Sequence, residues 1–492
     1  MVFNSFAFLL FFPIFLILYR VLPLKVRWIM MLVLSYIFYM GWQADLLYLI
    51  LFTTAVSYVC ALMIEKYEGR RGVQRAYMLT AVIASLAVLF FFKYFNFVSE
   101  NVTALLSSFG LGVSDFTLDL ILPVGISFYT FQTLSYVIDV YRGTMPAERH
   151  FGYYALYVSF FPQLVAGPIE RPENLLPQLK TKNPFTVNDT VMGLKFMLVG
   201  FFKKIVIADQ VAVIVNTVYN NVSGDEVNGF TVLIATLLFA VQIYCDFSGY
   251  TDIAIGCSRV LGIRLMQNFN DPYSATSIKD FWRRWHISLT SWFTDYVYIP
   301  LGGSRCKKWR HLLNILIVFL LSGIWHGAAW TYIIWGVTHG IYQIVGNLIA
   351  KPKERLITKM GLTSKSLGVK IFNTVVTFAL VCLAWMIFRA NNLSELGVLF
   401  YELFCGWGGE SISASLSALS LSLTSIFTIL LSIIVLKELD KQINTRPDLD
   451  RSGEPLSFAR SSVYMIITWT VAVAWMLLLA SNAESTFIYF QF

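Results

Sequence analysis

Charged residues are scarce in this sequence. They make up 13% of the 492 residues, whereas hydrophobic residues make up 57% and the mean hydropathy is +0.65. A water-soluble protein of this length needs many more charges to cover its surface, so the composition predicts an all-α polytopic membrane protein. The excess of 37 Lys and Arg over 29 Asp and Glu is explained by basic cytoplasmic loops, and we do not expect nucleic-acid binding.

Cysteines are also few and scattered. The six cysteines form no CxxC pair, and no histidine lies near them at the spacing of a metal ligand. We therefore expect neither a disulfide framework nor a metal site. The sequence lacks GxSxG, which argues against a serine nucleophile, and the pair Gly302 and Gly303 has neither spacing of a phosphate-binding loop.

Long apolar runs are abundant in place of charges. They occur at residues 5–19, 28–42, 46–64, 77–98, 119–140, 151–166, 193–216, 230–256, 312–336, 370–388, 422–436 and 461–480. Several are short or contain Gly or Pro, so we predict about 11 transmembrane helices, with further segments that enter the membrane without crossing it. Because no repeat or polar linker divides the chain, we expect a single domain over residues 1–492. Its parts are a core at 119–345, an interfacial segment at 268–310 and C-terminal helices at 370–480.

The distribution of basic residues predicts the orientation. Residues 1–22 lack a basic n-region and a small-residue cleavage site, so we interpret them as a retained span rather than a signal peptide. Three basic residues follow the first run, whereas the 99–118 loop has no Lys or Arg. The positive-inside rule then places the N-terminus outside, the polar stretch 437–460 inside and the tail 481–492 outside.

Two stretches are unsuited to plain lipid-facing helices. Residues 162–179 contain four prolines, which prevent a continuous helix. Such irregular backbone is tolerated at membrane depth only where it is buried in protein or lines a cavity. Residues 242–256 place Asp246, Asp252 and other polar residues inside an apolar run, and these groups need partners.

The stretch 268–330 combines an interfacial composition with an intramembrane histidine. Its first half mixes Arg283, Arg284 and His286 with six aromatic residues, which is typical of a segment at the membrane interface. Its second half is apolar enough to enter the bilayer and carries His326 in its middle. An imidazole there needs a partner or a wet cavity, so His326 is a functional candidate. The alternative is a buried histidine that is bonded to a backbone carbonyl.

The other histidines have plainer interpretations. His150 and His311 lie beside arginines in basic loops, which favours solvated surface positions. His339 lies near the end of an apolar run, which favours a helix-end or packing role. Gly323 and Gly327 flank the intramembrane histidine and permit close helix approach or a cavity beside its ring.

A histidine at position 326 is suited to general-base catalysis. A neutral imidazole in a water-poor cavity can remove the proton of a hydroxyl, because its ordinary pKa of about 6.5 lies near operating pH. This chemistry fits acyl transfer from a thioester. The cations that can attract the phosphates of an anionic donor are Arg283, Arg284, Lys307, Lys308 and Arg310. Anchoring to acidic lipid is the favoured alternative for any single one of them.

Six blocks, in order along the chain, resemble the membrane-bound O-acyltransferase (MBOAT) superfamily. They are SFYTFQTLSYVIDVYRG (127–143), FPQLVAGPIERP (161–172), YCDFSGYTDIAIG (244–256), NFNDPYSATSIKDFWRRWHISLTSWFTDYVYIPLGGSR (268–305), SGIWHGAAW (322–330) and the terminal FIYFQF. The sequence looks most like the branch that contains the alginate O-acetyltransferase membrane subunit and related bacterial acetylases. The related subunit of teichoic acid D-alanylation usually lacks the YIPLGG and CDFSGYTD forms.

This resemblance implies a fold and a set of roles. The fold is that of the MBOAT proteins, with transmembrane, re-entrant and interfacial helices around a central tunnel. His326 corresponds to the family's intramembrane histidine, the base, and His286 to its second histidine, which orients donor or substrate nearer the cytoplasmic mouth. The residues that we predict to bind the acyl donor in the tunnel are Arg283, Arg284, Trp285 and Trp325.

The activity implied by the resemblance is O-acyl transfer across a bacterial cytoplasmic (inner) membrane. Acetyl-CoA is the expected donor substrate, with no permanently bound cofactor, and the acceptor is an extracytoplasmic hydroxyl of a cell-surface polysaccharide. Because no SGNH hydrolase-like domain is present, we expect an extracytoplasmic SGNH-type or small membrane partner, besides membrane lipid. Two alternatives remain: D-alanyl transfer to teichoic acid from a carrier-protein thioester, and a lipid or glycan transporter in which histidines relay protons.

Overall fold

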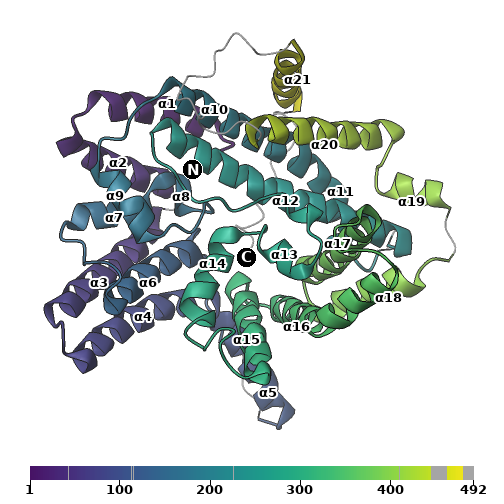
Figure 1. The fold of residues 1–492 in the computed structure, drawn as a ribbon, viewed down its shortest axis with the longest axis horizontal. Helices are drawn as coiled ribbons and strands as arrows, with labels where there is room; N and C mark the ends of the chain where they lie inside the picture. Colours follow the sequence, from purple (N-terminus) through teal and green to yellow (C-terminus); the bar gives the residue numbers. More distant parts are fainter. Residues whose placement is uncertain are drawn as a thin grey trace. The chain divides into compact units, whose positions relative to one another are not determined.

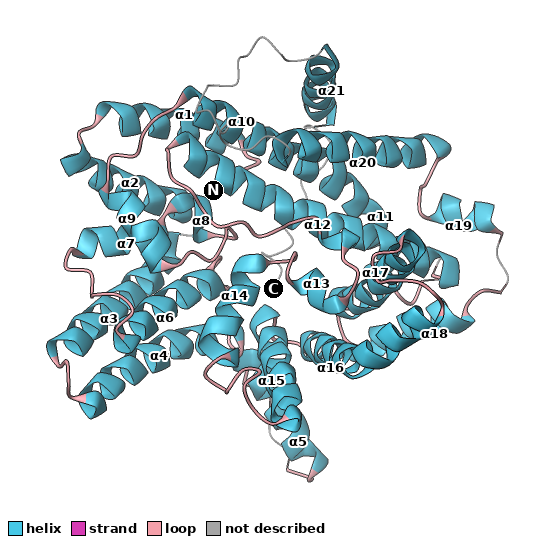
Figure 2. Cartoon of the chain, in the orientation of Figure 1, coloured by secondary structure: helices cyan, strands magenta, loops and turns pink. Residues whose placement is uncertain are grey.

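Helices form all the regular secondary structure in the described part of the protein. The computed structural model describes residues 1–42, 44–111, 114, 116–224, 227–408, 411–444 and 463–479. Over these residues the chain contains helices and loops and no strand (Figure 2). The prediction of an all-α protein is confirmed for this part of the chain. The tail 481–492, with its FIYFQF block, and most of the stretch 437–460 lie outside the described residues.

The chain divides into two compact units. The first unit contains Met1–Leu198 and Tyr250–Met266, and the second contains Val199–Gly249 and Gln267–Phe492. The boundaries fall inside two helices, α10 (Val187–Phe201) and α12 (Gly229–Val260), so each of these helices contributes to both units. The expectation of a single domain stays a prediction.

The first unit packs its N-terminal helices on an aromatic core. Its helices before α10 are α1 (Phe6–Val21), α2 (Leu24–Met40), η1 (Ala44–Leu46), α3 (Leu47–Lys66), α4 (Arg71–Lys93), α5 (Phe95–Ser108), α6 (Ile126–Arg142), α7 (Phe151–Ser159), α8 (Phe161–Leu164) and α9 (Pro172–Lys180). Ser5 caps α1, because its hydroxyl oxygen accepts a hydrogen bond from the N–H of Phe8. The Phe161 ring lies 4.8 Å from Phe15 and 5.4 Å from Phe38, centroid to centroid, and joins α8 to α1 and α2. Helices α3, α4 and α6 pack against one another (Figure 1).

The second unit contains the segment of interest for function. Its helices besides α10 and α12 are η2 (Phe202–Ala208), α11 (Asp209–Tyr219), η3 (Pro272–Ser274), α13 (Ile278–Trp282), α14 (Ile287–Phe293), η4 (Thr294–Tyr298), α15 (Lys308–His326), α16 (Trp330–Lys359), α17 (Leu367–Arg389), α18 (Leu393–Cys405), α19 (Ile412–Ala418), α20 (Leu423–Asn444) and α21 (Val463–Leu479). Helix α16 packs against α15, α17 and the short α13 (Figure 1). These contacts place the segment between α12 and α15 against the long helices of the same unit.

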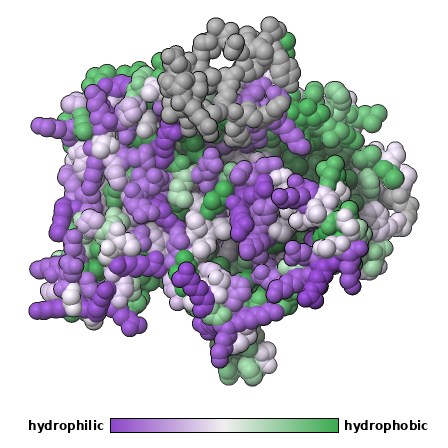
Figure 3. Space-filling view, viewed as in Figure 1, coloured by the Kyte–Doolittle hydropathy of each residue, from purple (hydrophilic) through white to green (hydrophobic). Residues whose placement is uncertain are grey.

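Six described helices are long and apolar enough to cross a membrane. They are Ala44–Lys66, Arg71–Lys93, Gly229–Val260, Lys308–His326, Trp330–Lys359 and Leu367–Arg389. A bent pair, Ile412–Ala418 with Leu423–Asp440, makes a seventh if it is counted as one span. Many of their apolar side chains remain exposed, and hydrophobic patches separate hydrophilic ones on the face seen in Figure 3. Such side chains are suited to contact with lipid tails.

Other apolar runs form shorter helices for identifiable reasons. The run 151–166 breaks at Phe160, whose non-helical backbone, with φ −55° and ψ 113°, separates α7 from α8. The run 193–216 contains the π-helical turn η2, and Pro13 lies inside the 16-residue α1. The count of about 11 transmembrane helices stays a prediction. The 99–118 loop was predicted wrongly in its first half, because α5 continues to Ser108.

The apolar run 312–336 is two helices rather than one span with a histidine in its middle. Helix α15 ends at His326, Gly327 has an extended backbone with φ −168°, and α16 begins at Trp330. The two helices then pack closely. A Cβ on Gly323 would lie 2.4 Å from the carbonyl oxygen of Tyr332, and one on Gly336 would lie 2.3 Å from that of Phe319. The predicted role of Gly323 in close helix approach is confirmed, and His326 lies at a helix end beside a turn.

The proline-rich stretch 162–179 has the predicted break. Helix α8 ends at Leu164, α9 begins at Pro172, and the residues between them are buried. Pro172 occupies the first turn of α9, where a missing N–H costs nothing. The irregular backbone is buried in protein, as its position requires.

Candidate active site

The backbone around His286 is fixed by one asparagine. The carbonyl oxygen of Asn268 accepts a hydrogen bond of 2.9 Å from the N–H of Ile287. The Oδ1 of the same asparagine accepts from the N–H of Ser288 at 3.3 Å and from its hydroxyl at 2.5 Å. Asn268 and Ser288 are both fully buried, so these bonds have no competition from water. They hold the start of α14 and therefore the residue just before it.

His286 occupies a strained position at the start of α14. Its backbone has φ 45° and ψ 54°, the left-handed region that costs a non-glycine residue about 1–2 kcal/mol. Its side chain is 0% exposed and lies edge-on to Phe247 at 4.7 Å between ring centroids. Burial, and secondarily the nearby His326, lower the pKa of His286 well below its ordinary value. His286 is therefore a neutral imidazole, and such strain commonly marks functional sites.

His326 is held in one orientation by its own helix. Its Nδ1 lies 2.7 Å from the backbone carbonyl oxygen of Ser322, one turn earlier in α15. A carbonyl oxygen only accepts, so Nδ1 carries the proton and donates it. In the neutral ring the lone pair is then on Nε2, the nitrogen available for basic chemistry. From the sequence, His326 was either a catalytic candidate or a histidine bonded to a backbone carbonyl. The observed hydrogen bond is compatible with both interpretations.

An aromatic cluster links three histidines within the second unit. The Trp325 ring lies 6.1 Å from His286 and 4.8 Å from His326, centroid to centroid. The Trp335 ring lies 4.7 Å from His326 and 5.1 Å from His339. All five side chains are at most 5% exposed. The two predicted catalytic histidines, 40 residues apart in the sequence, therefore both lie against one indole in a buried, aromatic environment.

A cavity of about 270 Å³ approaches this cluster from the surface of the second unit. Its walls come from residues 279–298 on one side and from α15 and α16 on the other. The exposed residues among its lining include Lys279, Arg283 and Asn347, whereas Ser322 is only 5% exposed. Ser322 supplies the carbonyl that binds His326. The cavity therefore runs from a cationic mouth to a buried end one helical turn from the imidazole.

The structure separates the four predicted donor-binding residues. Arg283 lines the cavity. Arg284 does not, because its Nε donates to the carboxylate of Asp280 at 3.0 Å and its Nη1 donates to a nearby serine. Trp285 is 1% exposed and stacks on Phe281 at 5.6 Å, and Trp325 contacts the rings of His286 and His326. Their assignment to donor binding stays a prediction, and Arg283 has the geometry that suits it best.

Lys279 was not singled out from the sequence, and the other histidines were predicted to lie outside the site. Lys279 lines the cavity mouth. His311, predicted to be solvated, is half-buried, lines the cavity and bonds the Tyr298 hydroxyl at 2.9 Å, so that prediction was wrong. His339 lies in the interior of α16 and packs against aromatic rings, which confirms the packing interpretation but not the helix-end one. His150 is exposed, as predicted, and caps α7.

A buried ion cluster lies elsewhere in the second unit. The Nζ of Lys204 lies 2.8 Å from a carboxylate oxygen of Asp209 and 2.8 Å from one of Asp246. All three side chains are at most 8% exposed. The prediction that the polar residues of 242–256 need partners is confirmed for Asp246. Lys204 lies in the π-helical turn η2, so the break in the helix places an ammonium group between two carboxylates.

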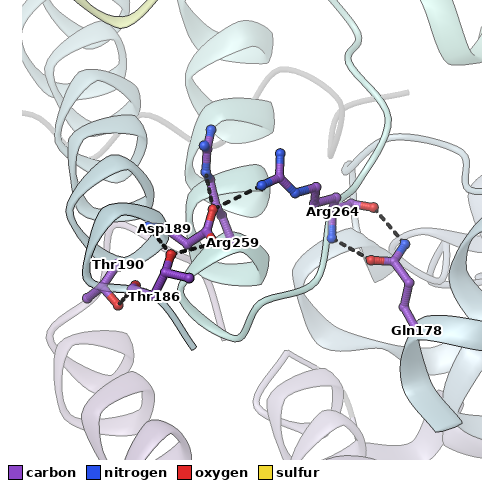
Figure 4. A network of polar contacts seen from close by, with 6 residues as sticks. All are labelled: Gln178, Thr186, Asp189, Thr190, Arg259 and Arg264. Carbon is purple, nitrogen blue, oxygen red and sulfur yellow. Dashed lines mark hydrogen bonds and ion pairs between the residues drawn. The ribbon is translucent and has the colours of Figure 1, made fainter. Parts of the chain in front are cut away.

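Two polar networks fix the chain around the end of α12 in the first unit. Asp189 accepts from Arg259 at 3.3 Å and from Arg264 at 3.2 Å, while Gln178 bonds both backbone groups of Arg264 (Figure 4). Glu170, which is 0% exposed, accepts from the N–H of Met266 and from an asparagine side chain. Burial raises the pKa of Glu170 to about 7, although both bonds oppose the shift.

The described residues contain no group of three or more His, Cys, Asp or Glu side chains that could hold a metal ion. The cysteines in this part of the chain form no disulfide.

Comparison with known proteins gives one family. The model of the MBOAT, membrane-bound O-acyltransferase family, matches residues 147–388. A probable alginate O-acetylase of Pseudomonas aeruginosa is 38% identical over 440 residues, which cover 89% of this chain and 81% of that protein. A peptidoglycan O-acetyltransferase of Helicobacter pylori is 37% identical over 392 residues, which cover 74% and 71%. A teichoic acid D-alanyltransferase of Bacillus subtilis is 30% identical over 288 residues, which cover 56% and 70%.

The chain belongs to the membrane-bound O-acyltransferase family. The resemblance seen in the six sequence blocks is confirmed, and with the apolar helices it identifies a multi-pass membrane protein. The matched region 147–388 includes both predicted catalytic histidines and every residue that lines the cavity. The candidate active site thus lies within the part of the chain that matches the acyltransferase family.

Proposed function

We propose that this protein is an O-acetyltransferase that moves an acetyl group from acetyl-CoA to a hydroxyl of a cell-surface polysaccharide. The observation that carries the proposal is the cavity that runs from exposed Lys279 and Arg283 to buried Ser322, whose carbonyl orients His326. The names of the Pseudomonas aeruginosa and Helicobacter pylori relatives support acetyl transfer to a polymer of the cell surface.

The proposed chemistry follows from the orientation of His326. With its proton on Nδ1, the ring accepts the proton of the acceptor hydroxyl at Nε2 as the hydroxyl oxygen attacks the thioester carbonyl. A carbon–oxygen bond forms, the carbon–sulfur bond breaks, and the thiolate leaves with the proton that the imidazole returns. The surrounding tryptophans exclude water, which would otherwise hydrolyse the donor. His286, neutral and close to His326, orients the reacting groups.

The mouth of the cavity suits an anionic donor. Lys279 and Arg283 are both exposed there, and guanidinium and ammonium groups bind phosphate oxygens with charge-assisted hydrogen bonds. Coenzyme A carries phosphates at one end and the acyl thioester at the other. This polarity matches a cavity that is cationic at its mouth and apolar towards its buried end.

Further expectations accompany this function. The enzyme belongs in the bacterial cytoplasmic membrane, with about 11 transmembrane helices and the N-terminus outside, so that the basic loops face the acetyl-CoA pool. The acetyl group reaches the polysaccharide with the help of an extracytoplasmic SGNH-type or small membrane partner. Labelling of single introduced cysteines from outside the cell tests the orientation, and labelling of the basic segment around Arg71 from that side would overturn it.

The chemical nature of the product tests the function. Cells that lack the gene are complemented with the wild type or with His326→Ala and grown with labelled acetate. Their purified surface polysaccharide is then treated with mild alkali, which releases O-linked esters. Labelled acetate should be released from wild-type material and be lost with His326→Ala, whereas His150→Ala, at an exposed histidine, should behave as wild type. Unmodified polysaccharide in the wild type would reject the proposal and favour transport.

D-alanyl transfer is the second candidate. It is favoured by the 30% identity to the Bacillus subtilis teichoic acid D-alanyltransferase, although that similarity covers 56% of the chain against 89% for the alginate relative. The same alkaline treatment distinguishes the two, because it would release alanine instead of acetate.

A further inference from the structure

One tryptophan belongs both to the cavity lining and to the histidine cluster. Trp282 lines the cavity and is only 5% exposed. Its ring lies 5.3 Å from Phe319, a second lining residue, and 5.7 Å from Trp335, centroid to centroid. Trp335 in turn lies 4.7 Å from His326. The indole of Trp282 therefore connects the lining of the cavity to the rings that surround the proposed base.

A buried hydrogen bond fixes the orientation of this indole. The Nε1–H of Trp282 donates to Nδ1 of His339 at 3.2 Å, across 57 residues of sequence. An indole nitrogen only donates, so Nδ1 of His339 is the acceptor and its proton is on Nε2. His339 is 0% exposed and its ring packs against Trp282 and Trp335 at 5.0 and 5.1 Å. The hydrogen bond of its N–H and these ring contacts hold the indole in one orientation.

We propose that Trp282, held in place by His339, limits the length of the acyl group that the cavity accepts. The acetyl group would lie in the part of the cavity lined by the indole and Ser322, and each further methylene would press on a ring that the hydrogen bond to His339 holds in place. His339 is a positioning residue, since it acts on the acyl group only through Trp282. This inference rests on the proposed function, because it takes a thioester as the occupant of the cavity.

The test measures acyl-length selectivity. Purified protein in nanodiscs is supplied with a polysaccharide acceptor and with acetyl-CoA or butyryl-CoA, and release of free CoA is followed to give kcat/KM for each donor. The ratio for butyryl-CoA over acetyl-CoA should rise about tenfold or more in Trp282→Phe, because hydrophobic pockets discriminate a methylene by roughly 10–200-fold. Trp292→Phe is the matched control. Trp292 is also 5% exposed but does not line the cavity, so its substitution should leave the ratio unchanged.

Two variants of His339 separate positioning from packing. His339→Leu removes the acceptor and should raise the ratio, whereas His339→Gln keeps an acceptor oxygen and should restore the wild-type ratio. Elution of each variant as a monodisperse peak in size-exclusion chromatography confirms that it is folded. A ratio unchanged in both Trp282→Phe and His339→Leu, with wild-type CoA release intact, would overturn the inference alone. Absence of CoA release in the wild type would instead refute the proposed function on which it rests.

Discussion

Substitution of Lys204 by methionine should destabilise the protein strongly. The ammonium group lies 2.8 Å from carboxylate oxygens of both Asp209 and Asp246, and the three side chains are at most 8% exposed. Methionine retains most of the side-chain volume but leaves two carboxylates buried without their shared cation. Removal of one partner of a buried ion pair typically costs about 3–5 kcal/mol. With two carboxylates left in the same small volume, we expect the upper part of that range.

Thermal unfolding of the purified protein in detergent measures the effect. Lys370→Met is the matched control, because Lys370 lies exposed on α17 and the same change there should cost little. The triple variant with Lys204→Met, Asp209→Asn and Asp246→Asn removes all three charges and should recover most of the lost stability. If Lys204→Met unfolds at the same temperature as the Lys370→Met control, the buried ion cluster does not stabilise this fold and the reasoning is refuted.

Three further predictions follow from individual contacts. The pKa of Glu170 is raised from 4.5 to about 7 in the folded protein, so its stabilising contribution is full below pH 4.5 and is lost as pH rises through 7. Relative to Glu170→Gln, the free energy of unfolding of the wild type should fall by about 3 kcal/mol between pH 5 and 8. Parallel plots of thermal stability against pH for the two proteins would contradict this. Gly323→Ala puts a methyl group 2.4 Å from the Tyr332 carbonyl oxygen. This change should lower the free energy of unfolding by about 1–3 kcal/mol and remove most of the CoA-release activity. An unchanged melting temperature would show that α15 and α16 separate freely. Arg283→Ala and Lys279→Ala should each raise KM for acetyl-CoA about fivefold with little change in kcat, because each removes a contact of about 1 kcal/mol at an exposed position. An equal rise in KM for a truncated donor that has no phosphates would argue against phosphate binding.

Composition and hydropathy were sufficient to predict the helical membrane fold. Residue chemistry with the sequence blocks led to the prediction of His286 and His326 as site residues, and the structure places both against Trp325. The sequence could not show how α15 and α16 divide. Residues 327–329 are Gly, Ala and Ala, as apolar as the helices on either side, so no polar signal marks the turn that leaves His326 at a helix end.

The sequence also could not show which residues become partners when they lie far apart in the chain. His339 looked like a packing residue, and only the folded chain reveals that its Nδ1 holds Trp282, 57 residues away. His311 looked solvated because Arg310 precedes it, yet the first turn of α15 directs it towards Tyr298. The sequence does contain a signal for the ion pair of Lys204 and Asp246. A cation in one apolar run and a carboxylate in another are each costly alone, and they stabilise each other when they meet.

The most direct test of the central claim is release of free CoA from acetyl-CoA by the purified protein in the presence of a polysaccharide acceptor. Wild type, His326→Ala, His286→Ala and the exposed-site control His150→Ala are compared in nanodiscs. The account predicts that His326→Ala loses about 100-fold or more of the wild-type rate, as expected for removal of a general base, while His150→Ala retains it. A His326→Ala protein that is folded and releases CoA at a near wild-type rate would contradict the account.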